Sequence, residues 1–257
     1  MRIKDFKAAL LIFPIVVLSN LSNIIILFSG ESISADPSFS NLFFSSLFNG
    51  VYQKDNSTLS LTMFGLIPQM FFNILYGTYI YRDLHISQTY FFIRQNSKKK
   101  WYIKCILRLA LIELFYVFIQ VSLPALFAVA NCNEVFSTEH IFKIIVSYVS
   151  LFMFTVISTL IVNILSLFCG SAISFFITYI YIIGAYYTSL KIDYITILDR
   201  KIDVSCLNII DTTIFNSSKS NYPQVGLLID FIYIIIISAV GYAILRNYDL
   251  SIKDKEI

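Results

Sequence analysis

Long apolar runs separated by short polar segments are the main pattern along this chain. A transmembrane α-helix needs about 20 apolar residues to cross roughly 30 Å of hydrocarbon. The runs that meet this length give the expected spans 8–28, 59–81, 105–130, 141–168, 172–190 and 223–245. The pattern therefore predicts an all-α polytopic membrane protein with six transmembrane helices, built as one transmembrane domain over residues 1–257.

The segment 82–104, with the sequence RDLHISQTYFFIRQNSKKKWYIK, is the most basic part of the chain and lies between the second and third spans. It also contains aromatic and aliphatic residues that a purely solvated loop would not need. This mixture favours an amphipathic element that contacts a partner, while the simpler alternative is an aromatic anchor at the lipid headgroups. The predicted contact residues are Tyr90, Phe91, Phe92, Ile93 and Arg94.

Charge places this segment and both chain ends on the cytoplasmic side. Most of the 19 Lys and Arg residues lie before the first span, within 82–108, or after the last span. Basic residues close to transmembrane helices are retained in the cytoplasm. This orientation leaves the short acidic segment 131–140 outside.

Two longer external segments are expected. The first, 31–58, is rich in phenylalanine at partly helical spacing, so it either lies in the outer interface or folds against the outer ends of the spans. In the second, 191–222, the apolar stretch 204–215 predicts short external helices before the last span. On the inner side, Cys-Gly-Ser at 169–171 predicts a tight turn between the fourth and fifth spans.

Composition supports a membrane location and excludes some partners. The chain is 57% hydrophobic and 14% charged, against about 25% charged residues in soluble domains. The net charge of +3 is modest, which makes nucleic acid a poor candidate partner. The abundance of Ile, Asn, Lys, Phe and Tyr is typical of an AT-rich bacterial genome, so we expect the bacterial plasma membrane.

Enzyme signatures are absent from the sequence. It contains no GxxxxGK[ST], HExxH or GxSxG motif, and its two histidines are expected on opposite sides of the membrane. The four cysteines show no metal or redox spacing; Cys132 and Cys206 could meet outside, although unpaired cysteines are the favoured interpretation. We therefore expect no catalytic, cofactor or metal site, and any ATP must be bound by another subunit.

Polar residues within the spans are the remaining candidate site. Glu113 and Asp230 should face protein or water, because an acid facing lipid costs roughly 2.5–3.5 kcal/mol on insertion scales. Each could line a substrate pathway or bind a proton, or could be a packing contact between helices. We expect Gln69, Asn73, Gln120 and Asn163 to form hydrogen bonds between helices.

The layout resembles the permease subunits of type 2 ABC exporters. In that family an amphipathic segment before the third span contacts the ATPase, the fourth and fifth spans meet in a tight inner turn, and short external helices precede the sixth. The chain is similar at 82–104, 169–171 and 204–215. The pattern FFIRQNSKKKW is similar to that of small permeases in antimicrobial-peptide export and immunity systems of Gram-positive bacteria.

The resemblance implies a subunit that forms a path for a hydrophobic or amphipathic cargo, such as a bacteriocin, a toxin or a lipid-like molecule. ATP and Mg²⁺ would bind a separate cytoplasmic ATPase, and a second permease chain, identical or related, would complete the path among membrane lipids. Two alternatives stay open. One is a membrane immunity or sensor protein without transport, and the other is a secondary transporter that uses Glu113 as a proton site.

Overall fold

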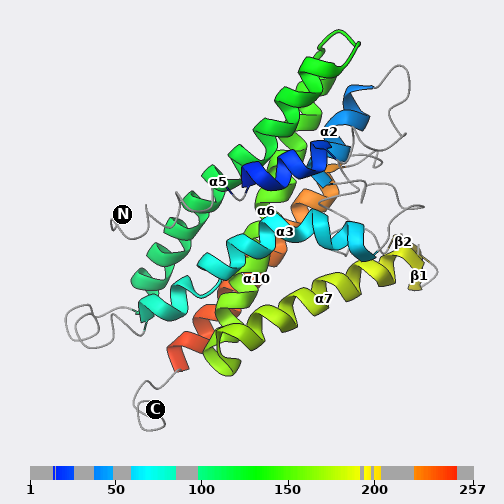
Figure 1. Ribbon diagram of the computed structural model, residues 1–257. Coiled ribbons are helices and arrows are strands. Elements are labelled where there is room, and N and C mark those ends of the chain that lie inside the picture. Colours follow the sequence, from blue (N-terminus) through cyan, green and yellow to red (C-terminus); the bar gives the residue numbers. More distant parts are fainter. Residues whose placement is uncertain are drawn as a thin grey trace.

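The computed structural model describes a bundle of helices with one small hairpin of strands (Figure 1). The contact residues 90–94 and the predicted external helices at 204–215 lie outside the described residues. The described residues are 14, 16–25, 38–48, 59–84, 98–191, 194–197, 200–203 and 223–247.

The helices follow the apolar runs of the sequence. An apolar helix, Val16–Ile25, comes first, and a short helical piece, 79–84, follows α3. The labelled elements are α2 (Phe39–Phe48), α3 (Leu59–Tyr76), α5 (Lys98–Asn131), α6 (Thr138–Cys169), α7 (Ser171–Lys191), β1 (Tyr194–Ile197), β2 (Arg200–Asp203) and α10 (Pro223–Asn247).

Three helices in the described part of the chain are long and apolar enough to cross a membrane: Lys98–Asn131, Thr138–Cys169 and Gly226–Arg246. They confirm the expectation of long apolar helices at the third, fourth and sixth predicted spans. Within their most apolar windows, 67% of α6 is buried but only 11% of α10. Helix α6 is therefore the centre of the bundle, while α10 presents an apolar surface to its surroundings.

Helices α3 and α5 run antiparallel. Near the middle of α3, Gln69 Nε2 donates to Gln120 Oε1 at 3.2 Å. At the other end of the pair, Trp101 Nε1 donates to Asp83 Oδ2 at 3.2 Å. The basic start of α5 therefore lies beside the end of the helical piece 79–84.

Helices α3 and α6 run in the same direction. Asn73 Nδ2 donates to Ser158 Oγ at 3.0 Å, and the Ile80 N–H further along donates to Asn163 Oδ1 at 2.8 Å. Both pairs advance in the same sense along the two helices. Helices α3 and α6 thus point one way and α5 the other, as expected for neighbouring spans that alternate in direction.

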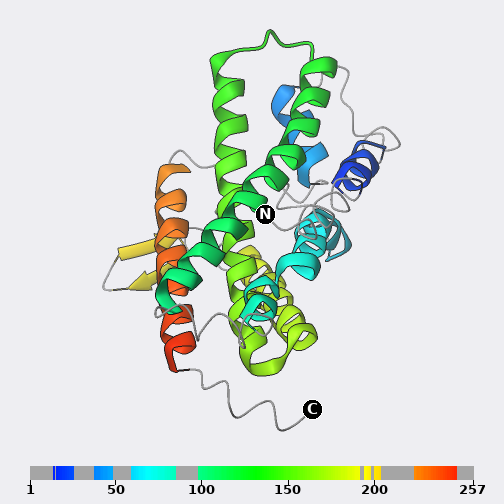
Figure 2. The same cartoon turned by 90° about the vertical axis from the view of Figure 1, so that its left-hand side faces the viewer.

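Helix α10 also ends at the basic end of the bundle. Lys98 Nζ, at the start of α5, donates to the Arg246 carbonyl at 3.4 Å. The rings of Tyr102 and Tyr242 stack with their centroids 6.3 Å apart. Figure 2 shows α10 reaching the lower end of the molecule, opposite the tip of the α5–α6 hairpin.

The predicted turn at 169–171 is present. Helix α6 ends at Cys169, and α7 begins at Ser171. Between them Gly170 has φ of 78°, a left-handed conformation that glycine adopts without the strain caused by a Cβ. The single intervening residue makes α6 and α7 neighbours at this end.

Two helices differ in extent from the spans predicted for them. The span expected over 59–81 is interrupted, because α3 ends at Tyr76 and helix resumes only at 79–84. Helix α5 begins at Lys98 instead of residue 105. The sequence KKKWYIK contains no helix breaker, and burial of Trp101 and Tyr102 inside the bundle stabilises the added turns.

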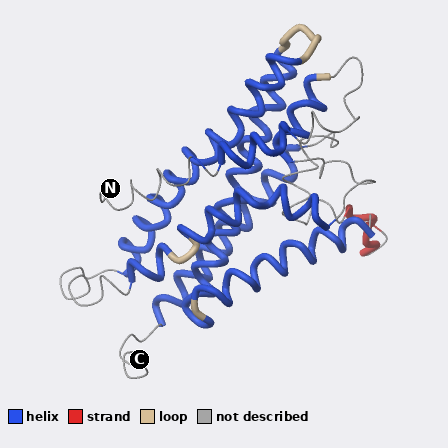
Figure 3. The backbone as a smooth tube through the Cα atoms, in the orientation of Figure 1, coloured by secondary structure: helices blue, strands red, loops and turns tan. Residues whose placement is uncertain are grey.

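The described residues are almost entirely helical, as the all-α prediction expected, and one small hairpin of strands is added to them. Strands β1 and β2 pair antiparallel, with Ile195 opposite Ile202, inside a segment expected to contain no strand. The sequence YITI of β1 contains three consecutive β-branched residues, which favour strand over helix. Figure 3 shows this hairpin beyond the end of α7 that is far from the α6–α7 turn.

The described part of the phenylalanine-rich segment, helix α2, folds against the bundle. In Figure 2, α2 lies beside the upper half of the α5–α6 hairpin. Phe39 and Phe43 are fully buried, and their rings stack with centroids 5.7 Å apart. Two alternatives were open for 31–58, and its described helix α2 agrees with the second, because it packs against the long helices.

Candidate functional site

A polar face of α5 turns toward the inside of the bundle. Glu113, Tyr116 and Gln120 are spaced by three and four residues, which places them on one side of a helix. All three are buried, and Glu113 has an exposed fraction of 0%. This spacing was readable in the sequence, although Tyr116 was not singled out there.

Glu113 lies near the middle of α5. At 1.5 Å per residue it is about 22 Å from Lys98 and about 27 Å from Asn131. The Thr159 side chain on α6 is its polar neighbour, but the Thr159 hydroxyl donates to the Thr155 carbonyl at 2.7 Å. Within the described residues, neither carboxyl oxygen of Glu113 has a hydrogen-bond partner.

Gln120 connects three helices. Its side-chain oxygen accepts the bond from Gln69 on α3, and its backbone carbonyl accepts from Asn20 Nδ2 of the first helix at 3.1 Å. Asn20, Gln69 and Gln120 are each about 1% exposed. Pairs of this kind satisfy polar groups that would be costly in lipid.

Asn73 makes the corresponding contact between α3, α6 and α7. Its Nδ2 donates to Ser158 Oγ at 3.0 Å and to Tyr179 Oη at 2.7 Å. Ser158 in turn donates to the Thr155 carbonyl at 3.0 Å. The amide therefore binds α3 to two neighbouring helices at once.

Asn163 bridges the interruption of α3. Its Oδ1 accepts the Ile80 N–H at 2.8 Å, and its Nδ2 donates to the Tyr76 carbonyl at 3.3 Å and the Thr159 carbonyl at 2.9 Å. A break in a helix leaves backbone groups unpaired, and within a membrane these groups need a protein partner. One side chain of α6 provides it on both sides of the break.

Gly77 occupies the break because no larger residue fits. A Cβ at this position would collide with the Asn73 carbonyl oxygen and would lie 2.8 Å from Val162 Cγ1 on α6. The Gly77 N–H still donates to the Asn73 carbonyl at 2.8 Å. Close contact between α3 and α6 therefore depends on the absence of a side chain here.

The predicted intramembrane residues separate into two groups. Glu113, Gln69, Asn73 and Asn163 are all buried in the polar interior formed by α3, α5 and α6, where the three amides make the expected bonds between helices. Asp230, for which a substrate pathway, a proton site and a packing contact were the alternatives, is fully buried on α10. We name the interior group, together with Tyr116, Gln120, Ser158, Thr159 and Tyr179, the polar cluster.

Sequence reasoning missed three members of this cluster on α6 and α7. Ser158, Thr159 and Tyr179 are common in apolar helices, and no motif distinguishes them. One signal was available, because Thr155, Thr159 and Asn163 recur every four residues of α6 and so mark one polar face.

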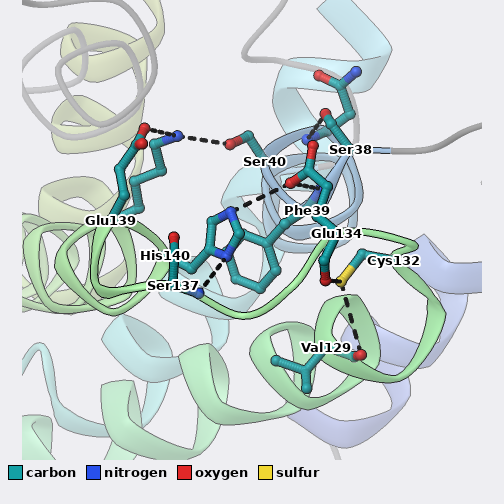
Figure 4. Close-up of polar contacts among 11 residues, drawn as sticks. Ser38, Phe39, Ser40, Val129, Cys132, Glu134, Ser137, Glu139 and His140 are labelled. Atoms are coloured by element: carbon teal, nitrogen blue, oxygen red, sulfur yellow. Dashed lines mark hydrogen bonds and ion pairs between the residues drawn. The ribbon is translucent and has the colours of Figure 1, made fainter.

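A second polar contact lies at the tip of the α5–α6 hairpin (Figure 4). Glu134 Oε2 accepts the Phe39 N–H at 3.2 Å and contacts His140 Nε2 at 3.3 Å. Because Phe39 is the first residue of α2, the carboxylate stabilises the positive end of that helix. Lys143 adds a bond from its Nζ to Ser40 Oγ at 3.0 Å.

A third contact joins the described residues on either side of the segment 85–97. Asp83 Oδ2 accepts from Trp101 Nε1 at 3.2 Å and from Cys105 Sγ at 3.6 Å. Asp83 lies in the last turn of the helical piece 79–84, whereas Trp101 lies in the first turn of α5. The two ends of the segment 85–97 are therefore held side by side, although the segment itself is outside the described residues.

The chemistry that these contacts offer is hydrogen bonding and proton binding. Among the described residues, no group of three His, Cys, Asp or Glu side chains could hold a metal ion. Cys105, Cys132 and Cys169 have free thiols. Comparisons with protein-family models, with curated proteins and with solved structures found no match for this chain.

Proposed function

We propose that this chain is the transmembrane subunit of an ATP-driven exporter of the type 2 ABC class. It would have six spans, with both termini and the segment 82–104 in the cytoplasm. A separate ATPase would bind ATP and Mg²⁺, and a second permease chain would complete the path for a hydrophobic or amphipathic peptide or lipid-like cargo.

The bond between Asp83 and Trp101 is the observation that carries this proposal. A permease without its own nucleotide site needs a cytoplasmic element that contacts the ATPase and transmits its movement to the spans. The described residues on either side of the segment 85–97 lie next to each other, since this bond joins them. Force applied to this segment would act on α3 and α5 together.

The surroundings of this contact support the same function. Lys98 binds the last turn of α10 through the Arg246 carbonyl. Gly241 on α10 leaves room for the Tyr102 hydroxyl and for Ile164 of α6. Three long helices therefore meet at the base of the proposed coupling segment, so one cytoplasmic contact can reach the whole bundle.

The interrupted helix α3 would transmit force from the coupling segment to the interior of the bundle. The piece 79–84 is joined to α5 by Asp83 and to α6 by the Ile80–Asn163 bond. In secondary transporters, discontinuous helices of this kind form substrate and ion sites. Movement of 79–84 would therefore reach the polar cluster directly.

Affinity purification of the chain with associated proteins tests the proposal. Phe91→Ala combined with Phe92→Ala should leave the chain folded but remove a co-purifying ABC ATPase, because a buried aromatic contributes far more than an exposed ion pair. Replacing Lys98, Lys99 and Lys100 by Gln is the matched control and should reduce recovery less. Equal recovery of the ATPase with wild type and with the double alanine variant would contradict the docking role and favour an immunity or sensor protein.

A further inference from the structure

We propose that Glu113 is a proton-binding site, occupied at neutral pH, so that its side chain is a neutral carboxylic acid inside the bundle. This inference goes beyond the exporter function and does not depend on it. It concerns the chemical state of one group, which is fixed by its surroundings.

Burial makes the ionised form of Glu113 costly in free energy. Glu113 has no exposed surface and lies in the middle of α5. An ionised carboxylate in an apolar environment costs much more free energy than a neutral acid unless a cation or several donors compensate. The charge state of Glu113 therefore depends on which groups face its carboxyl.

No cation among the described residues is placed to compensate the charge. Between 65 and 84 the charged side chains of the α3 region are only Arg82 and Asp83, at its far end, and α2 has none. On α5 itself, Lys104 and Arg108 are exposed to the surroundings.

The remaining elements give the same result. On α6 the charged or titratable groups are Glu139, His140 and Lys143 at the outer end, Tyr148, and Cys169 at the inner end. The described side chains of α7 include tyrosines but no charged group, and those of α10 include only Asp230, an acid, and the terminal Arg246. An ion pair with Glu113 is therefore absent from the described part of the chain.

Within the described residues, no group donates a hydrogen bond to either carboxyl oxygen of Glu113. The Thr159 hydroxyl, the polar neighbour, uses its single proton on the Thr155 carbonyl. Tyr116 Oη and Gln120 Nε2, on the same face of α5, make no hydrogen bond to the carboxyl. A carboxylate only accepts hydrogen bonds, so here it would face groups that do not donate to it.

A carboxylic acid fits this environment. It carries a proton of its own, and the Thr159 oxygen retains a lone pair that can accept it after a small side-chain rotation. The neutral acid then needs no counter-charge. The proton would leave only when water or a cationic group reached the cluster, which makes Glu113 sensitive to opening of the bundle.

Infrared difference spectroscopy tests this state directly. We compare the wild-type chain in lipid at pH 7 with Glu113→Gln, which is neutral and similar in shape. The expected difference is the loss of one carboxylic-acid C=O band with no loss from the carboxylate bands. Asp230→Asn, at the buried acid of α10, is the matched control and should retain the Glu113 band.

The opposite result is equally clear. Loss of a carboxylate band in Glu113→Gln, with the acid region unchanged, would overturn the inference. If that variant does not fold, wild-type chain with ¹³C-labelled glutamate carboxyls should still show one acid band that shifts with the label at pH 7. Absence of such a band would also overturn the inference, and neither outcome bears on docking of an ATPase.

Discussion

Asn163 of α6 holds the start of the second helical piece of α3 through its bond to Ile80. Its Oδ1 accepts the Ile80 N–H at 2.8 Å, while its Nδ2 donates to the Tyr76 carbonyl on the other side of the interruption. A helix can break inside the bundle because one amide supplies both an acceptor and a donor.

Asn163→Leu should therefore destabilise the protein. The substitution keeps the volume but leaves the Ile80 N–H and the Tyr76 carbonyl buried without this partner, at about 1–3 kcal/mol for each unsatisfied group. Denaturant unfolding in detergent measures the loss. Asn131→Leu, at an exposed asparagine that bonds only the Phe127 carbonyl of its own helix, is the control and should change stability little. Equal effects of the two variants would refute the bridging role.

Gly77→Ala should also be destabilising. The new methyl group would collide with the Asn73 carbonyl and press on Val162, so α3 and α6 must separate. Gly184→Ala on α7 is the matched control, because a Cβ there meets no atom within 4 Å and alanine favours helix by up to about 1 kcal/mol. We expect the melting temperature to fall for the first variant and to stay or rise for the second. A fall of the same size in both would show that the contact at Gly77 is unimportant.

Opposite ends of α6 should lie on opposite sides of the membrane. The helix has 32 residues, which corresponds to about 48 Å. Cys132 precedes it at the outer tip, and the exposed Cys169 ends it beside the α6–α7 turn. In single-cysteine variants of intact cells, a membrane-impermeant maleimide should label Cys132, and should label Cys169 only after permeabilisation. Cys105 alone should resist labelling in both conditions, since it is 1% exposed.

Labelling of Cys132 and Cys169 from the same side would contradict this orientation. Labelling of Cys169 alone in intact cells would instead reverse it. A denatured sample, in which all thiols react, provides the reference for complete labelling.

Most helices could be predicted from the sequence, because a long apolar run has few other ways to satisfy its backbone. The break after Tyr76 could not, since Gly77 and Thr78 read as part of a continuous apolar segment. What permits the break is Asn163, more than 80 residues later, and only the packing of α6 on α3 brings them together.

The candidate site was predicted in part for the same reason. Burial of Glu113 follows from the cost of exposing an acid to lipid, and the sequence contains that information. Its neighbour Thr159 lies on another helix, α6. Contact between the two side chains therefore depends on the register of α5 against α6. Similarly, the sequence marks 82–104 as basic and aromatic but cannot indicate that Trp101 is buried against Asp83.

Photo-crosslinking from position 91 is the most direct test of an ATPase-driven permease. A photoreactive phenylalanine analogue would replace Phe91 in the proposed coupling segment or, as control, Phe136, which is 45% exposed at the outer tip of the α5–α6 hairpin. After irradiation of native membranes, we expect the chain labelled at 91 to be joined to an ABC ATPase, and the chain labelled at 136 to be free of it. Failure to recover an ATPase from position 91, or its recovery from position 136, would contradict the account.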